Sequence, residues 1–309
     1  MLVPLHCVCQ ITPIKSLVKM HNIADPTNFV CECNRAFHKE TLHPLVSLID
    51  MSAPCVGSQV KTDCYAVVFK HRAADSEKYG RRYYDYSDGT LLFVTPSKKV
   101  ELATADGKML IFHPTLIMYT PLGARLKEFS FFKYRPEESL HISCCEEKVI
   151  NRCLGCISDE LCWGIDEYSK TIICNSIELL LNYCRRFYTR QFITRHNVNV
   201  EAIDELDRLI DNYFTSGQAA AHGLPTAGRF APRLGMSAEY VNDMLKNETG
   251  KTVCEYVQLR RIQLAKEFLM ASDRSVGDIS ALLGFSTAGC FATVFKKITG
   301  CTPEEYRRN

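Results

Sequence analysis

The last third of the chain contains an internal repeat, which restricts the possible folds more than any other feature of the sequence. With a shift of 50 residues, Thr249-Gly250 aligns with Thr299-Gly300. Slightly upstream, a shift of 49 aligns Leu234-Gly-Met-Ser237 with Leu283-Gly-Phe-Ser286. Matches that recur in a nearly constant frame indicate a duplicated structural unit.

Each copy has the sequence pattern of two short helices joined by a tight turn. The glycine of the Leu-Gly pair allows a positive φ, and the serine two residues later is a good cap for a second helix. In the second copy, Ser275-Val-Gly-Asp278 is a capping box that starts the supporting helix. In the first copy, Pro232 falls inside the supporting helix, where it should disturb the hydrogen-bond ladder. The pattern predicts two helix-turn-helix units.

Between the two units, residues 252–271 are expected to form one helix. A rod of about 18 residues is about 27 Å long. Recognition helices held about 34 Å apart can enter successive major grooves on one side of B-DNA. A bundle of αα-repeats with no role in DNA binding is the alternative that this geometry leaves open.

Three segments of the tail together resemble one known family. They are Ile279–Ser286, Val294–Lys297 and Thr302–Arg307. Over residues 205–309 the chain is similar to the AraC/XylS transcription factors. This resemblance implies sequence-specific promoter binding by a tandem helix-turn-helix domain, following a cupin-like sensing barrel and dimerisation helices.

The resemblance also implies which residues contact DNA. The implied base-contacting positions are Glu239, Asn242, Asp243, Gly289, Ala292 and Thr293. The implied contacts to the DNA backbone are Ser237, Lys246, Ser286, Lys296 and Lys297.

The side chains at the base-contacting positions are unusual for a protein that reads DNA. Arginine, the commonest partner of guanine, is missing from all six positions. Asn242 can read adenine, whereas Glu239 either accepts from cytosine or is a solvated carboxylate. Asp243 should repel phosphates. An oligomerising or ligand-sensing regulator with weak base readout is therefore the alternative function.

The N-terminal half has the pattern of short strands separated by turns. Its strand-like segments are Leu45–Ile49, Tyr65–Phe69, Tyr83–Tyr86, Leu91–Val94 and Leu110–Phe112. We expect an α+β protein with a cupin-like sensing barrel in residues 1–140, a helical dimerisation segment in 141–200 and the DNA-binding domain in 205–309. Residues 215–223, which contain two glycines, are expected to be a linker.

One helix of the middle segment carries an apolar stripe with spacings of 4, 3, 4 and 3 residues. The stripe consists of Ile173, Ile177, Leu180, Cys184 and Phe187. Such a stripe is typical of a helix that pairs with another, so it predicts a dimer seam. A core stripe within one chain is the alternative.

Sixteen cysteines raise the question of disulfides or metal. The start of the chain has no export-signal pattern and no apolar run is long enough for a membrane span, so we expect a cytoplasmic protein with reduced thiols. Cys153-Leu-Gly-Cys156 lies in a cysteine-rich stretch, 144–162, for which zinc stays an open alternative, although no suitable second ligand pair is evident.

Enzymatic activity is not expected. The nine histidines contain no HxH pattern for a metal-cupin site, and Pro54-Cys-Val-Gly57 lacks the histidine that follows the reactive cysteine of an alkylation-repair protein. The net charge of +2 excludes a histone-like polycation. We therefore predict a regulator without metal or cofactor. Its expected partners are double-stranded DNA, RNA polymerase, a second copy of the chain and a small effector, with no membrane.

Overall fold

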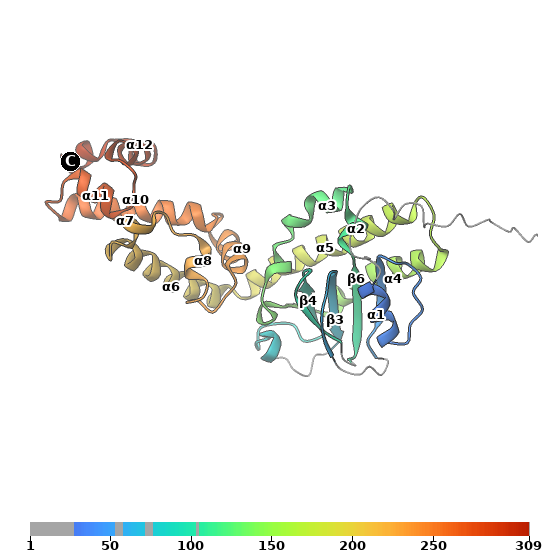
Figure 1. Cartoon of the computed structure of the whole chain (residues 1–309). Helices are drawn as coiled ribbons and strands as arrows, with labels where there is room; N and C mark the ends of the chain where they lie inside the picture. The colour runs from blue at the N-terminus through green and yellow to red at the C-terminus, as the bar shows by residue number, and fades with distance from the viewer. Residues whose placement is uncertain (1–27, 53–57, 72–76, 103–104, 309) are drawn as a thin grey trace, which may run out of the picture.

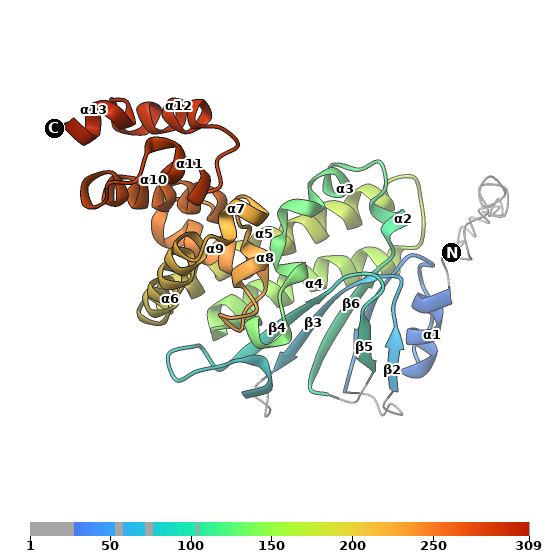
Figure 2. The same cartoon turned by 60° about the vertical axis from the view of Figure 1, so that its left-hand side comes forward.

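The computed structural model describes residues 28–52, 58–71, 77–102 and 105–308. Figures 1 and 2 show an N-terminal lobe built around a β-sheet and a C-terminal lobe made of helices. Among the described residues, no helix is long and apolar enough to cross a membrane.

The main sheet of the N-terminal lobe has five antiparallel strands in the order β1-β6-β3-β4-β7, and a second sheet pairs β2 with β5. The strands are β1 (Val46–Asp50), β2 (Ser58–Lys61), β3 (Tyr65–His71), β4 (Gly89–Val94), β5 (Lys99–Leu102), β6 (Gly107–Phe112) and β7 (Leu140–Ile142). The expected α+β class is confirmed. The cupin-like barrel is not, because the described strands form two sheets and neither closes on itself.

The alternation of side chains along the central strands gives the sheet two apolar faces. Val67 and Phe69 of β3 pack with the long helices α4 (Cys144–Trp163) and α5 (Ser169–Thr194). Ala66 and Val68 pack towards α1 (Asn28–Ala36). The expected strand at Tyr83–Tyr86 is wrong. This stretch is a turn, in which the Asp85 carboxylate accepts from the Arg82 amide at 2.8 Å.

The middle of the chain forms two long helices, α4 (Cys144–Trp163) and α5 (Ser169–Thr194), which pack against the sheet. The predicted seam residues lie on α5, where each is at most 6% exposed: Ile173, Ile177, Leu180, Cys184 and Phe187. They belong to the chain's own core, together with the sheet and α4. The structure therefore corrects the predicted dimer seam to a core stripe, because the sheet needs an apolar cover and α5 supplies it.

Short helices connect the sheet to α4. They are α2 (Pro114–Ile117), α3 (Pro121–Arg125) and the 3₁₀ helices η3 (Glu77–Tyr79), η4 (Leu126–Glu128), η5 (Ser130–Lys133) and η6 (Pro136–Glu138). Of these, η5 lies against the C-terminal lobe.

The C-terminal lobe contains the predicted tandem units. Its helices are α6 (His196–Thr215), α7 (Gln218–His222), α8 (Ala227–Phe230), α9 (Ala238–Thr249), α10 (Val253–Ala271), α11 (Val276–Leu282), α12 (Ala288–Thr299) and α13 (Pro303–Arg308). Gly235 and Gly284 form the two turns with φ of 66° and 70°. Helix α8 has four residues, in agreement with the effect expected of Pro232.

The predicted linker at residues 215–223 is wrong in part, because it contains α7. Ala219 of α7 is buried in the C-terminal core. The carbonyl oxygen of Ala219 would lie 2.4 Å from a Cβ added at Gly284, so α7 packs directly on the turn of the second unit.

Candidate nucleic-acid interface

The second recognition helix, α12, presents its predicted base-contacting side to solvent. Ser286, Gly289 and Thr293 are exposed, and Ala292 is half-buried. The Thr293 hydroxyl donates to the Gly289 carbonyl at 2.9 Å, so its proton is used within the helix. This surface allows close approach of a DNA backbone but offers few side-chain groups for reading bases.

Two lysines extend this surface. Lys296 and Lys297 are exposed in the last turn of α12, and Lys246 is exposed at the corresponding place in α9. A lysine near the end of a helix is also favoured by the helix dipole, so its position alone does not identify a phosphate contact.

The first recognition helix, α9, is in a different situation, because the N-terminal lobe contacts two residues on its predicted base-contacting side. The Asp243 carboxylate accepts hydrogen bonds from the Ser130 hydroxyl and from the Tyr134 hydroxyl, the latter at 2.7 Å. Glu239 pairs with Lys133 at 3.2 Å. Burial beside the Asp243 carboxylate raises the pKa of Tyr134, so its phenol stays a donor.

The start of α9 is also engaged. Ser237 caps the helix by accepting from the Tyr240 amide, and its own amide and hydroxyl donate to the Glu138 carboxylate, each at 2.6 Å. Glu138 is 5% exposed. The predicted backbone contact Ser237 therefore binds a buried carboxylate of the N-terminal lobe.

Asn242 has a structural partner inside the C-terminal lobe. Its amide oxygen accepts from the Val253 amide at 3.1 Å, at the start of α10. A bidentate contact to adenine needs both the oxygen and the nitrogen of the side chain. Asn242 would have to give up its bond to α10 to make that contact.

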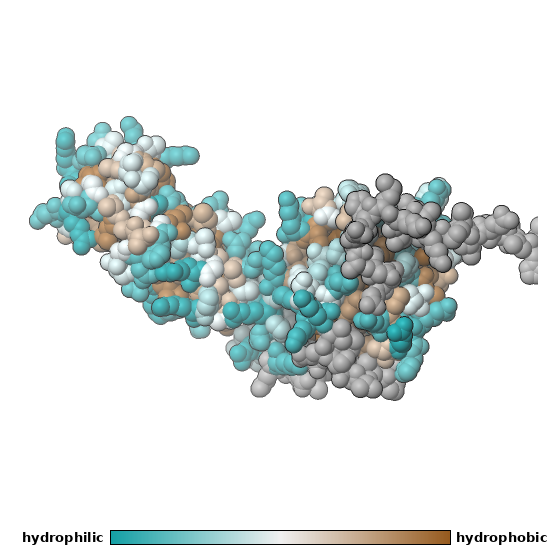
Figure 3. Space-filling view, viewed as in Figure 1, coloured by the Kyte–Doolittle hydropathy of each residue, from teal (hydrophilic) through white to brown (hydrophobic). Residues whose placement is uncertain are grey.

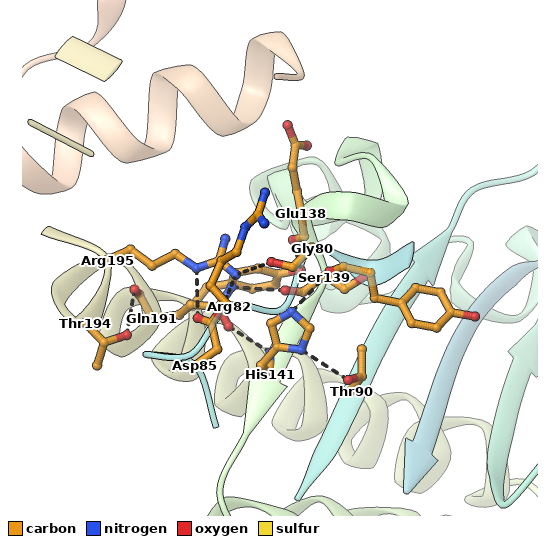
Figure 4. A network of polar contacts seen from close by, with 12 residues as sticks. Gly80, Arg82, Asp85, Thr90, Glu138, Ser139, His141, Gln191, Thr194 and Arg195 are labelled. Atoms are coloured by element: carbon orange, nitrogen blue, oxygen red, sulfur yellow. Dashed lines mark hydrogen bonds and ion pairs between the residues drawn. The ribbon is translucent and has the colours of Figure 1, made fainter. Parts of the chain in front are cut away.

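A buried polar network continues the interface (Figure 4). Arg195, between α5 and α6, donates to the Asp85 carboxylate at 2.8 and 2.9 Å and to the Tyr240 hydroxyl of α9 at 3.2 Å. Nearby, the His141 ring lies 3.1 Å from both the Thr90 hydroxyl and the Tyr79 carbonyl. Arg195 thus connects the N-terminal lobe to the first recognition helix.

Sequence analysis missed the residues that hold α9. They are Ser130, Lys133, Tyr134, Glu138 and Arg195, which lie 45 to 113 positions away from their partners in the chain. The signal available in the sequence was the pair of carboxylates at base-contacting positions, Glu239 and Asp243. A carboxylate accepts hydrogen bonds from protein donors, whereas it repels DNA phosphates.

A hollow of about 300 Å³ lies beside this interface in the N-terminal lobe. Its aromatic lining residues are Tyr79, Phe93, Phe131, Tyr134 and Tyr188. Its basic lining residues are Lys70, Lys78, Lys98, Lys99 and Arg135. No aspartate or glutamate is among the described residues that line it.

The cysteine-rich stretch lies on α4, with Cys153 buried and Cys144, Cys145, Cys156 and Cys162 exposed. In the part of the chain that the structure describes, no three His, Cys, Asp or Glu side chains are grouped so as to hold a metal ion. Pro54-Cys-Val-Gly57 lies outside the described residues.

The C-terminal lobe is similar to parts of known proteins. Residues 230–309 match the family model described as "Helix-turn-helix domain". The bifunctional transcriptional activator/DNA repair enzyme AdaA of Bacillus subtilis is 36% identical over 72 residues, which are 23% of this chain and 34% of AdaA. The probable transcription factor PqrA of Proteus vulgaris is 35% identical over 79 residues, 26% of this chain and 65% of PqrA.

Among solved structures, the C-terminal domain of the response regulator yesN from Fusobacterium nucleatum is 27% identical. The match covers 34% of this chain and 97% of that domain, with a TM-score of 0.29. The chain thus spans less than two thirds of AdaA and PqrA, and these similarities concern its C-terminal part.

Two helix-turn-helix units, the match to the family model and the sequence relatives define the C-terminal lobe as the DNA-binding domain of a transcription regulator. This lobe is a domain of the kind found in the AraC/XylS transcriptional regulators.

Proposed function

We propose that the whole chain regulates transcription by binding promoter DNA, with α12 as the helix that enters the major groove first. The observation that carries this proposal is the exposure of α12 along the side formed by Ser286, Gly289 and Thr293, next to Lys296 and Lys297. This side of α12 meets solvent, and Figure 3 shows hydrophilic side chains interspersed with apolar ones on the visible surface of the C-terminal lobe.

The test is selection of DNA by the full chain. Genomic fragments are mixed with the purified protein, and bound fragments are sequenced and footprinted. We expect enrichment of promoter fragments and a footprint that weakens in the Lys296→Ala/Lys297→Ala variant. Retention of all fragments alike would instead favour the alternative regulator with weak base readout, which the small side chains of α12 support.

We place a small effector in the hollow of the N-terminal lobe. Aromatic walls favour an apolar body, and the basic side chains in the lining favour a negative charge. The effector class is therefore a small organic anion with an aromatic or aliphatic body. Thermal unfolding with octanoate and with octanol tests this, because octanoate should raise the unfolding temperature more than octanol does.

Pairing of two chains is part of the proposal, although it cannot use the buried stripe of α5. Large apolar side chains that are exposed from the end of α4 to the middle of α5 support a different surface: Trp163, Tyr168, Ile172 and Leu179. Sedimentation of the wild type and of Leu179→Asp distinguishes a dimer on this surface from a monomer.

RNA polymerase is the expected partner at the promoter, and neither catalysis nor a cofactor is required. As a chromosomal regulator, the protein would act in the cytoplasm.

A further inference from the structure

The side of α9 that the family would turn towards DNA is the side that faces the N-terminal lobe. We call the side formed by Glu239, Asn242 and Asp243 the groove face of α9. Asp243 is held by Ser130 and Tyr134, and Glu239 by Lys133. A duplex cannot reach these carboxylates while η5 lies within hydrogen-bond distance of them. The major groove is about 12 Å wide and admits one helix, not a helix with a second segment against it.

The amino-terminal end of α9 carries a second, independent contact. The N-terminus of a helix attracts anions, and DNA-binding helices use it to hold a phosphate. Here the buried Glu138 carboxylate accepts from both the amide and the hydroxyl of Ser237. A carboxylate of the N-terminal lobe therefore occupies the place that a phosphate would take.

Apolar packing makes the contact a continuous interface. Tyr240 and Met244 of α9 are buried in the core of the N-terminal lobe, while Val241 and Leu245 are buried in the core of the C-terminal lobe. The Tyr240 ring lies 5.1 Å from the ring of Tyr134, between centroids. Helix α9 is thus shared between the two lobes.

Helix α12 provides the comparison within the same chain. Its groove-facing positions, Gly289 and Thr293, are exposed. Figures 1 and 2 both show α12 away from the N-terminal lobe. The corresponding positions of α9 differ in chemistry, because two of the three are carboxylates. Carboxylates repel DNA phosphates but match the hydroxyl and ammonium donors of Ser130, Tyr134 and Lys133.

We propose that the groove face of α9 is a docking surface for the chain's own N-terminal lobe, and that docking excludes the first helix-turn-helix unit from DNA. In the docked state only α12 enters a groove, and release of α9 adds a second groove one helical turn away. This inference rests on the proposed function, since it assigns the regulation of that DNA-binding site.

The test uses the full chain and changes only the N-terminal side of the contact. Ser130→Ala/Tyr134→Phe removes both donors to Asp243 without altering any residue of the C-terminal lobe. Tyr213→Phe is the matched control, because it removes a buried tyrosine hydrogen bond, to the Gly223 carbonyl at 3.0 Å, within the C-terminal lobe. The DNA is a labelled 40-base-pair duplex with a sequence enriched from a random library by the wild type.

We expect the double variant to bind this duplex about tenfold more tightly than the wild type, because each lost bond was made to a charged group. Its hydroxyl-radical footprint should extend by about 10 base pairs. Amide hydrogen exchange in residues 238–249 should become faster, whereas Tyr213→Phe should change neither affinity nor footprint.

Three results would overturn either the docking inference or the proposed function. A double variant that binds the duplex with wild-type affinity and footprint overturns the docking inference, as does a wild-type footprint that already spans two grooves. Failure of both proteins to bind any duplex at low salt overturns the proposed function instead.

Discussion

The Tyr134 hydroxyl, in the N-terminal lobe, donates a hydrogen bond of 2.7 Å to the Asp243 carboxylate on the first recognition helix. The two residues are 109 positions apart in the chain. Asp243 is the residue whose charge fits DNA least well among the predicted base contacts, and this bond gives that charge a structural role.

Replacement of Asp243 by arginine should raise the affinity for DNA. Asp243→Arg removes the acceptor for Ser130 and Tyr134 and replaces a repelled charge with an attracted one. The gain in DNA affinity that comes from the changed charge should fall as the salt concentration rises. The gain in affinity that comes from release of α9 should not depend on salt in this way. Titrations at low and high salt, with Asp243→Ala for comparison, separate the two. Wild-type affinity of Asp243→Arg at low salt, with the fold intact, would show that this residue does not approach DNA.

Lys297→Ala should weaken binding to all DNA sequences alike. A lysine that neutralises one phosphate contributes a slope of about −0.9 to the plot of log affinity against log salt, so the variant should lose about one unit of slope. Lys148→Ala is the control, because Lys148 is an exposed lysine of α4 in the N-terminal lobe. Equal slopes for the wild type and Lys297→Ala would exclude Lys297 as a phosphate contact.

Ile177→Asp should unfold the N-terminal lobe rather than separate a dimer. Ile177 is fully buried in the core between α5 and the sheet. An unpaired carboxylate there should cost about 4 kcal/mol or more of unfolding free energy. Urea denaturation measures this cost, with Asn175→Asp, an exposed position of the same helix, as the control. A folded, monomeric Ile177→Asp protein would restore the seam hypothesis.

The two turn glycines provide a matched pair. Alanine at Gly235 or Gly284 must adopt a positive φ, which costs about 1–2 kcal/mol. Only at Gly284 does the added Cβ meet a neighbour, the Ala219 carbonyl oxygen at 2.4 Å, whereas nothing lies within 4 Å at Gly235. We expect Gly284→Ala to be less stable than Gly235→Ala by about 1–3 kcal/mol in denaturant titrations. Equal losses would mean that α7 does not press on this turn.

Acidification should destabilise the protein through His141. Burial lowers the pKa of His141 to about 4, with Asp85 opposing this effect and Arg195 and Arg81 adding to it. In the unfolded chain the imidazole takes up a proton near pH 6.5, so the folded state loses relative stability as the pH falls from 6.5 to 4. Denaturation between pH 7.5 and 4.5 should show a shallower decline for His141→Gln than for the wild type. If the stability of the wild type and of His141→Gln falls equally as the pH is lowered, groups other than His141 cause the loss.

Local patterns determined most of the C-terminal lobe before any coordinates were considered. The repeat, the Leu-Gly turns and the serine caps predicted both helix-turn-helix units. Ser237 caps α9 as expected, whereas the N-cap of α12 is Thr287 and not Ser286. The capping box at Ser275 and Asp278 is also present. These features follow from hydrogen bonds and backbone preferences within a few residues, so they are readable from neighbouring positions alone.

Tertiary structure decided which surfaces are free. The stripe of Ile177 and its neighbours has the same spacing whether it faces a second chain or its own sheet, so its partner is invisible in the sequence. The same holds for α9. Glu239 and Asp243 are polar residues on one side of a helix, and only the fold brings Ser130, Lys133 and Tyr134 against them. Periodicity specifies which side of a helix is apolar or charged, whereas the partner of that side depends on contacts between residues far apart in the chain.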